Sequence, residues 1–269
     1  VVFTNTTPTG VTTPSFATKA DFGGLPLASS LSPHAVAVAD INGDGKPDIV
    51  VVDQHRILWY ENPTWKPRVI LQGKTKPDNV CACTLDIDGD GKLDIVGGAF
   101  WSPANTTTSG TLQWLQRGKT LDEEWTLHPI GEEPTMHRVR VADLFGDGKK
   151  QIIAVPLQGR GSSAKGNHLD GRPVRVLAYP IPADPVKGPW KPVVLNESLH
   201  VVHNFCTIAG KANGEGLYLA SYEGVTLLTR NGEAWKSSRE GAGNQANPMG
   251  SRGASEIKTG TLNGSYYVA

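Results

Sequence analysis

Short runs of β-branched and aromatic residues alternate with turn-rich segments along the whole chain, and no segment shows a helical pattern. Four such runs form a unit that recurs every ~50 residues. Within a unit, an acidic loop precedes the second run, and a tryptophan opens the fourth, as at Trp65, Trp125, Trp190 and Trp235. Four-stranded repeats of this kind predict an all-β fold, a β-propeller. A β-sandwich with two calcium loops is disfavoured, because it would not repeat the tryptophan so regularly.

The repeat also predicts the domain organisation. Residues 1–30 are expected to be a leader or the closing strand of the last blade, and residues 31–269 the propeller. The predicted blades span about residues 31–72, 77–131, 134–196 and 199–238, with a partial blade at 253–269. Propellers usually have 4 to 8 complete blades, so four and a half suggest a fragment of a longer protein. Two insertions, Ser102–Ser109 and Gly159–Gly171, are expected to project from one rim of the ring.

The acidic loops have the ligand pattern of a calcium site. Oxygen-bearing side chains stand at positions 1, 3, 5 and 9, and glycines allow the tight turn. An EF-hand is excluded, because the flanks are strand-like and position 12 is Val51 or Gly97. The third copy, Asp143–Gln151, has lost ligands and is expected to bind weakly at most. The predicted ligands of structural calcium are Asp40, Asn42, Asp44 and Asp48 in the first loop and Asp86, Asp88, Asp90 and Asp94 in the second.

The composition and charge of the chain limit the kinds of binding partner that the sequence favours. The formal net charge is zero, so no basic field favours nucleic acid or an anionic membrane. No apolar run approaches the roughly 20 residues of a membrane span. The 3 cysteines form no Cys-x-x-Cys pair and are expected to be buried thiols. The calcium loops favour a secreted or periplasmic protein, as do glycosylation acceptor sequences at Asn5, Asn105, Asn196 and Asn263.

Histidines recur at one position of the repeat. His34 and His137 each lie six residues before the first aspartate of their acidic loop, and His203 has the same phase in the fourth unit. The first strand of each blade is expected to line the central channel, so these imidazoles would converge at one mouth. Convergent imidazoles can bind a transition metal, transfer protons, or do both. His200 is a further candidate metal ligand, although a structural role is equally compatible with its position.

Two more residues are predicted at the same mouth. Arg138 follows His137, and Glu256 lies in the corresponding region of the fifth unit, so both are candidates for binding substrate. An arginine there could hold a carboxylate. Alternatively, Arg138 and Arg140 form salt bridges between blades.

The acidic loops resemble the FG-GAP/VCBS repeats of integrin-like propellers, secreted lectins and polysaccharide lyases, a likeness that implies only the fold. A narrower resemblance, to the propeller domain of the aldos-2-ulose dehydratase family, rests on five segments. They are Gly110–Leu115, Glu124–Gly131, Met136–Arg140, Ile153–Pro156 and His200–His203. This resemblance implies a seven-bladed propeller followed by other domains, and a zinc ion that polarises the ketone of a sugar. It also implies that His137 transfers protons and that His203, with His200, is a candidate zinc ligand.

Two functions remain open on these observations. The first is a carbohydrate-active lyase or dehydratase that eliminates water, or a glycosidic leaving group, from a keto-sugar or uronic sugar. In that case His137 and His34 are the catalytic residues. The alternative is a non-catalytic, calcium-stabilised propeller that binds carbohydrate or protein. Trp59, Trp101 and Trp114 could then offer faces for stacking on a sugar, although such tryptophans more often lie in the core.

Overall fold

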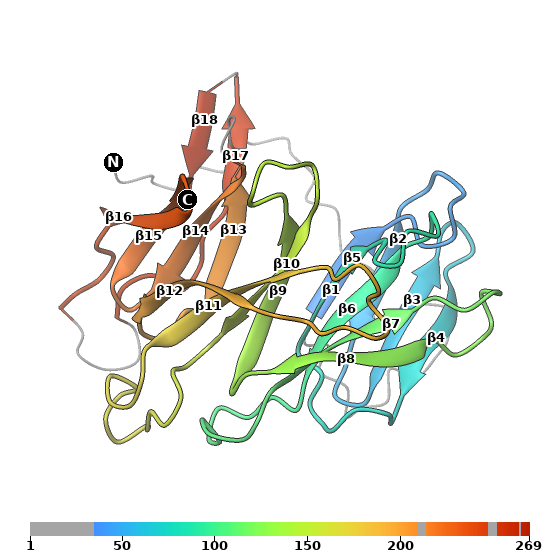
Figure 1. The fold of residues 1–269 in the computed structure, drawn as a ribbon, viewed down its shortest axis with the longest axis horizontal. Helices are drawn as coiled ribbons and strands as arrows, with labels where there is room; N and C mark the ends of the chain where they lie inside the picture. Colours follow the sequence, from blue (N-terminus) through green and yellow to red (C-terminus); the bar gives the residue numbers. More distant parts are fainter. Residues whose placement is uncertain (1–34, 209–213, 247–251, 264) are drawn as a thin grey trace, which may run out of the picture. The chain divides into compact units, whose positions relative to one another are not determined.

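The computed structural model describes residues 35–208, 214–246, 252–263 and 265–269 (Figure 1). The described strands belong to one compact unit, Ser32–Ala269. His34 and the predicted leader or closing strand at 1–30 lie outside the described residues. Every named element in the described part is a strand, and none of its residues forms an apolar helix long enough to cross a membrane.

Four antiparallel sheets of four strands follow one another along the chain, each with its strands paired in sequence order. A pair of strands, β17–β18, comes last. This arrangement confirms the expected all-β propeller fold. The strands of the first two sheets are β1 (Ala35–Ala39), β2 (Asp48–Val52), β3 (Arg56–Glu61), β4 (Lys66–Gln72), β5 (Cys81–Leu85), β6 (Asp94–Ala99), β7 (Thr111–Gln116) and β8 (Thr126–Glu132).

The remaining strands repeat the same meander. They are β9 (Met136–Ala142), β10 (Gln151–Pro156), β11 (Val174–Pro180), β12 (Val193–Leu199), β13 (Asn204–Ile208), β14 (Gly216–Ser221), β15 (Gly224–Asn231), β16 (Ala234–Gly241), β17 (Thr259–Leu262) and β18 (Ser265–Val268). The first strands of successive sheets contact one another, β1 with β5, β5 with β9, and β9 with β13. Residues on these strands are therefore neighbours in space although they are far apart in sequence.

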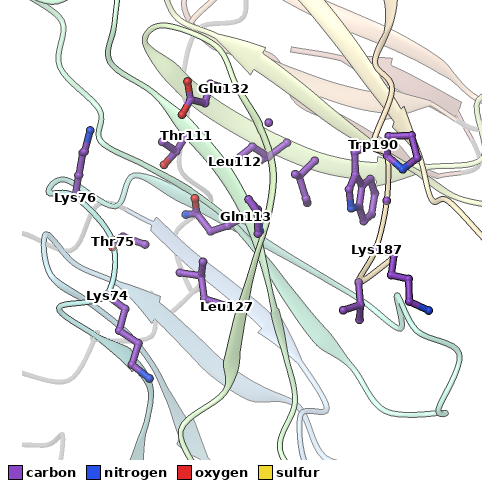
Figure 2. Close-up of a pocket in the computed structure, with 16 residues that line it drawn as sticks. Lys74, Thr75, Lys76, Thr111, Leu112, Gln113, Leu127, Glu132, Lys187 and Trp190 are labelled. Atoms are coloured by element: carbon purple, nitrogen blue, oxygen red, sulfur yellow. The ribbon is translucent and has the colours of Figure 1, made fainter. Parts of the chain in front are cut away.

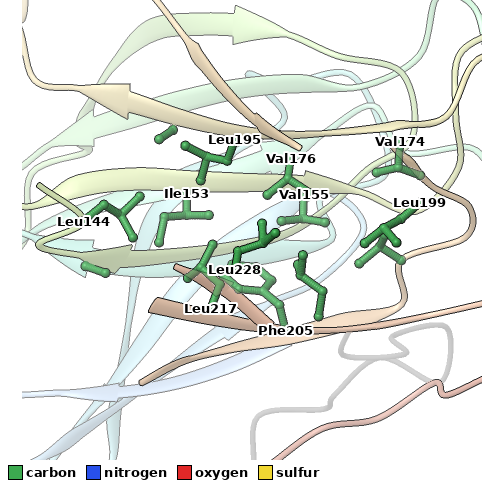
Figure 3. Packing of buried hydrophobic residues seen from close by; sticks show 14 residues of the cluster. Leu144, Ile153, Val155, Val174, Val176, Leu195, Leu199, Phe205, Leu217 and Leu228 are labelled. Carbon is green, nitrogen blue, oxygen red and sulfur yellow. The ribbon is translucent and has the colours of Figure 1, made fainter. Parts of the chain in front are cut away.

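The hydrophobic core lies between neighbouring sheets. One cluster, which includes Ile153, Val176 and Phe205, joins the third and fourth sheets (Figure 3). Ile152, next to Ile153 on β10, packs instead into the cluster shared with the second sheet. A strand covered on both faces needs apolar side chains at consecutive positions. This requirement explains why β10 is a continuous apolar run rather than an alternating one.

Several side chains differ from their expected environments. Trp59 and Trp114 are completely buried in the core, so neither can stack on a sugar. Cys81 is a buried free thiol, whereas Cys83 and Cys206 are only half-buried. The expectation of three buried cysteines is therefore met for Cys81 alone.

The two insertions pack against each other. The Thr106 hydroxyl donates a hydrogen bond to the Ser162 carbonyl over 2.7 Å, and the Gly161 N–H donates to the Thr106 carbonyl over 3.0 Å. These hydrogen bonds join the insertion of the second sheet to the insertion of the third sheet.

Candidate functional site

His137 and His203 come together although 66 positions (203 − 137) separate them. His137 is the second residue of β9, and His203 directly precedes β13. Because β9 contacts β13, the two imidazole rings lie 5.2 Å apart between centroids, inclined by 49°. The Arg138 Nε donates to the His203 carbonyl over 3.3 Å, which ties the two strands together at this point. We call His137 and His203 the histidine pair.

His137 is held in an unusual environment. His137 is 8% exposed, and neither of its ring nitrogens has a hydrogen-bond partner among the described residues. Trp101, from the β6–β7 connection, lies 5.8 Å from the imidazole between ring centroids. Burial lowers the pKa of His137 to about 3, and the charges of Arg138 and His203 add to the effect. The imidazole of His137 is therefore neutral at physiological pH.

His203 and His200, the two candidate metal ligands, each have one ring nitrogen in contact with a neighbouring group. His203 Nδ1 lies 2.8 Å from the Ser255 carbonyl, which accepts only from an N–H, so the neutral form of this imidazole carries its lone pair on Nε2. His200 Nδ1 lies 2.9 Å from a carboxylate oxygen of Glu223, and its neutral form has the same tautomer. Such second contacts are typical of metal-bound histidines.

A zinc site requires more protein ligands than His203 and His200. Catalytic zinc takes three protein ligands. Among the described residues, however, the one group of three or more histidine, cysteine or acidic side chains close enough to share a metal is Asp86, Asp88 and Asp94. The described residues around His203 therefore do not fit a three-ligand zinc site.

Arg138 and Glu256 lie close to the histidine pair. Burial lowers the pKa of Arg138, and the charge of Glu256 partly counters that effect. Burial of Glu256 alone would raise its pKa, but hydrogen bonds from Lys258, the Ile257 N–H and Asn204 lower it overall. Neither Arg138 nor Arg140 forms an ion pair within the described ranges, so the predicted salt bridges between blades are absent there. Arg140 instead donates to the Val139 carbonyl and to Asn204 Oδ1.

A small pocket of about 220 Å³ opens beside His203. Its walls come from the segment before β13, from Tyr222 and from the stretch Arg252–Ser255. The volume is below the ~300–1,000 Å³ of typical small-molecule sites. One wall is His203, behind which lies the buried His137.

The acidic loops adopt a ligand-cage geometry. In the first loop, Asp40 accepts hydrogen bonds from the backbone N–H groups of Gly43, Asp44 and Gly45, and the positive φ of Gly45 (84°) makes that turn possible. Asp48 is fully buried and accepts from Ile41 N. In the second loop Asp86, Asp88 and Asp94 meet, and Asp94 is buried. Burial raises its pKa to about 6, and the nearby carboxylates of Asp88 and Asp90 add to the rise. A cation would relieve this crowding.

The third loop closes in a different way. Gln151 stands at position 9, and its Oε1 accepts from Leu144 N over 2.8 Å, as Asp94 accepts from Ile87 N over 3.0 Å. The Gln151 Nε2 donates to the Lys149 carbonyl over 2.6 Å. That carbonyl is at position 7, where calcium loops of this length place a backbone ligand. An amide N–H thus binds the oxygen that a cation would bind.

A larger pocket of about 490 Å³ lies away from the histidine pair (Figure 2). Its lining comes from the segment before β5, from β7 and β8, and from the β11–β12 connection that carries Trp190. Gln113, in this lining, is 4% exposed, and within the described part of the chain its buried Nε2 has no hydrogen-bond partner. Sequence reasoning did not find this residue. A glutamine between Leu112 and Trp114 on a strand gives no signal of its own.

Comparison with known proteins decides the family. A profile described as the aldos-2-ulose dehydratase β-propeller domain matches residues 109–267, and one described as an FG-GAP-like repeat matches residues 40–97. The chain belongs to the aldos-2-ulose dehydratase β-propeller family. Both resemblances inferred from sequence motifs are thereby confirmed.

A curated relative in this family is aldos-2-ulose dehydratase of Phanerodontia chrysosporium. It is 24% identical over 225 residues, which cover 81% of this chain but 19% of the relative. The chain thus spans about a fifth of that protein's length. A solved structure of an Agrocybe aegerita lectin, titled for specific recognition of non-reducing terminal N-acetylglucosamine, aligns with 76% of this chain and 65% of its own. The TM-score is 0.35 and the identity 15%, so no argument rests on that likeness.

Proposed function

We propose that this member of the aldos-2-ulose dehydratase β-propeller family is the sugar-binding part of a carbon–oxygen lyase. The reaction would eliminate water, or a glycosidic leaving group, from a keto-sugar or uronic sugar. The observation that carries the proposal is the close approach of His137 and His203 from two different sheets. Family membership and the relative's name support a sugar as the substrate.

The histidine pair suits proton transfer in such an elimination. The reaction removes a proton from the carbon beside the carbonyl and delivers a proton to the departing oxygen on the next carbon. A neutral imidazole has one nitrogen that can accept a proton and one N–H that can donate. The low pKa of His137 makes it a weak acceptor, so in this proposal His203 accepts the proton and the N–H of His137 donates one. His203 lines the pocket next to it and would contact the sugar first. Arg138 and Glu256 would then orient the substrate's polar groups.

Metals and location belong to the same proposal. Calcium in the first and second acidic loops would stabilise the strand connections, and a secreted or periplasmic location would keep those loops loaded. Zinc at His203 and His200 stays part of the proposal, and it would require more ligands than these two histidines supply. Other domains of a larger chain are included in the proposal as partners that would complete the active site.

Turnover of keto-sugars by the intact protein tests this function. We expect His137→Leu and His203→Leu to abolish elimination, and His55→Ala to keep it. His55 is an exposed histidine whose hydrogen bonds within the described residues use only its backbone, so it is a matched control. Full turnover by folded His137→Leu would refute the catalytic assignment.

A second candidate function is carbohydrate binding without catalysis, at the larger pocket of Figure 2. The buried, unpaired amide of Gln113 favours it, because a polar ligand would satisfy a group that otherwise costs ~1–3 kcal/mol. The Trp190 ring offers a partly exposed aromatic face in the same lining. Glycan binding that Gln113→Leu and Trp190→Ala abolish, but His137→Leu leaves intact, would establish this function instead.

A further inference from the structure

The contact between the two insertions positions an arginine. Arg160 lies at the start of the second insertion, and its Nη1 donates to the carbonyl of Thr107 in the first insertion over 2.9 Å. The backbone contacts of Thr106 with Gly161 and Ser162 hold the same two segments together. Arg160 is thus fixed on one side by its neighbour, although its side chain is 45% exposed.

The backbone of a second arginine, Arg172, is hydrogen-bonded to the backbone of Arg160. The Arg172 N–H donates to the Arg160 carbonyl over 3.0 Å, which closes the neck of the insertion. The approach is so close that a Cβ added to Gly159 would lie 1.6 Å from the Arg172 carbonyl oxygen. Two cationic residues therefore stand on hydrogen-bonded neighbouring segments. Like charges in such pairs are destabilising unless something compensates them.

A third arginine lies beside them and shares one buried carboxylate. Arg175 Nη1 is 2.9 Å from Glu133 Oε2, and Arg160 Nη2 is 3.9 Å from the same oxygen. The Glu133 side chain is 5% exposed. This carboxylate accepts a hydrogen bond from Arg175 and lies within ion-pair distance of Arg160, and both arginine side chains stay partly exposed.

The three arginines surround a cavity of about 390 Å³ together with Pro173 and Glu197. Within the described residues, the Arg172 guanidinium has no hydrogen-bond or ion-pair partner. Glu197 likewise forms no ion pair with any of the three arginines there. The cavity thus has three guanidinium groups against two carboxylates, and one of those cations is uncompensated.

We propose that this cavity binds an oxyanion, namely the carboxylate or sulfate group of an acidic carbohydrate. Guanidinium groups match planar and tetrahedral oxyanions through paired N–H donors, and two of the three are already oriented by Thr107 and Glu133. The site involves none of the residues of the histidine pair, and it stands whether or not the chain is catalytic. If the elimination reaction is confirmed, the cavity would hold an acidic part of the substrate away from the reacting carbons.

Isothermal titration of the intact protein with glucuronate, with glucose and with inorganic sulfate tests the proposal. We expect glucuronate to bind, glucose to bind at least tenfold more weakly, and added salt to weaken the binding. Arg172→Gln should weaken glucuronate binding by about tenfold or more, since it removes a charge-assisted donor. Lys236→Gln removes one exposed positive charge from β16 and is the matched control.

Glu197→Gln gives a test that a purely structural role would not satisfy. It removes the opposing charge from the cavity wall and should tighten glucuronate binding several-fold. Equal weakening by Arg172→Gln and Lys236→Gln would overturn the site, because only the net charge would then matter. Binding of sulfate without glucuronate would overturn the acidic-sugar assignment in favour of an inorganic anion. Loss of glucuronate binding in His137→Leu would assign that binding to the histidine pair and also overturn the proposal.

Discussion

Replacing His137 by leucine should make the protein more stable. The two ring nitrogens are buried without partners, and each unsatisfied polar group costs ~1–3 kcal/mol. Leucine fills a similar space without polar atoms. It forfeits the ring contacts with Trp101 and His203, which are worth ~0.5–1.5 kcal/mol each. The net expectation is a gain of about 1–3 kcal/mol at neutral pH.

The gain should grow as the pH falls. The pKa of His137 is about 3 in the folded protein, whereas an unfolded histidine titrates near 6.5. Between these values the unfolded state binds more protons, so wild-type stability falls with decreasing pH. The slope for one such group is ~1.4 kcal/mol per pH unit. At pH 5.5 the advantage of His137→Leu should therefore exceed its value at pH 7.5 by about 1 kcal/mol.

Urea unfolding at both pH values measures the effect, provided that the m-value is unchanged. His203→Leu is the control within the same pair, because its Nδ1–H bonds the Ser255 carbonyl. That variant should lose about 0.5–1.5 kcal/mol. If His137→Leu were destabilised to the same degree, or if its advantage did not change with pH, the buried imidazole would not be neutral and unpaired. The reasoning about its environment would then fail.

Two further predictions concern the loops and the thiols. Asp88→Ala should abolish one calcium site in a titration of bound ions per chain, whereas Asp147→Ala should change nothing, because an amide N–H already closes the third loop. Equal losses from both variants would contradict this difference. Burial raises the pKa of Cys81 to about 12, so in native protein at pH 8 Cys81 should alkylate more slowly than the half-buried Cys206, as mass spectrometry of the labelled peptides would show. Rapid labelling of Cys81 would show that β5 is accessible.

Much of the fold was readable from the repeat. An acidic loop followed by a continuous apolar run marks a tight connection into a strand buried on both faces, as with Asp94 and the rest of β6. The phase of the histidines relative to these loops also placed His137 and His203 at matching positions. Such arguments succeed because strand alternation and turn chemistry are local properties of the chain.

Less of the chemistry of the site could be predicted from the sequence. The pKa of His137 depends on burial beneath Trp101 and on the charge of Arg138, which no spacing in the sequence reveals. The availability of Trp59 for stacking was likewise settled by the neighbouring sheet that covers it. The unusual feature of Gln113 is its buried amide Nε2, which has no partner among the described residues, and this feature exists only in the folded chain.

By itself, the sequence determined the strand repeat, the acidic loops and the family, since these depend on residue type and spacing along the chain. The tertiary structure alone decided which side chains from different sheets share an environment. It paired His137 with His203, left both nitrogens of one imidazole without partners, and gathered Arg160, Arg172 and Arg175 around one cavity. Burial and electrostatic coupling act through space, between groups that may be far apart in sequence, so only the folded chain defines them.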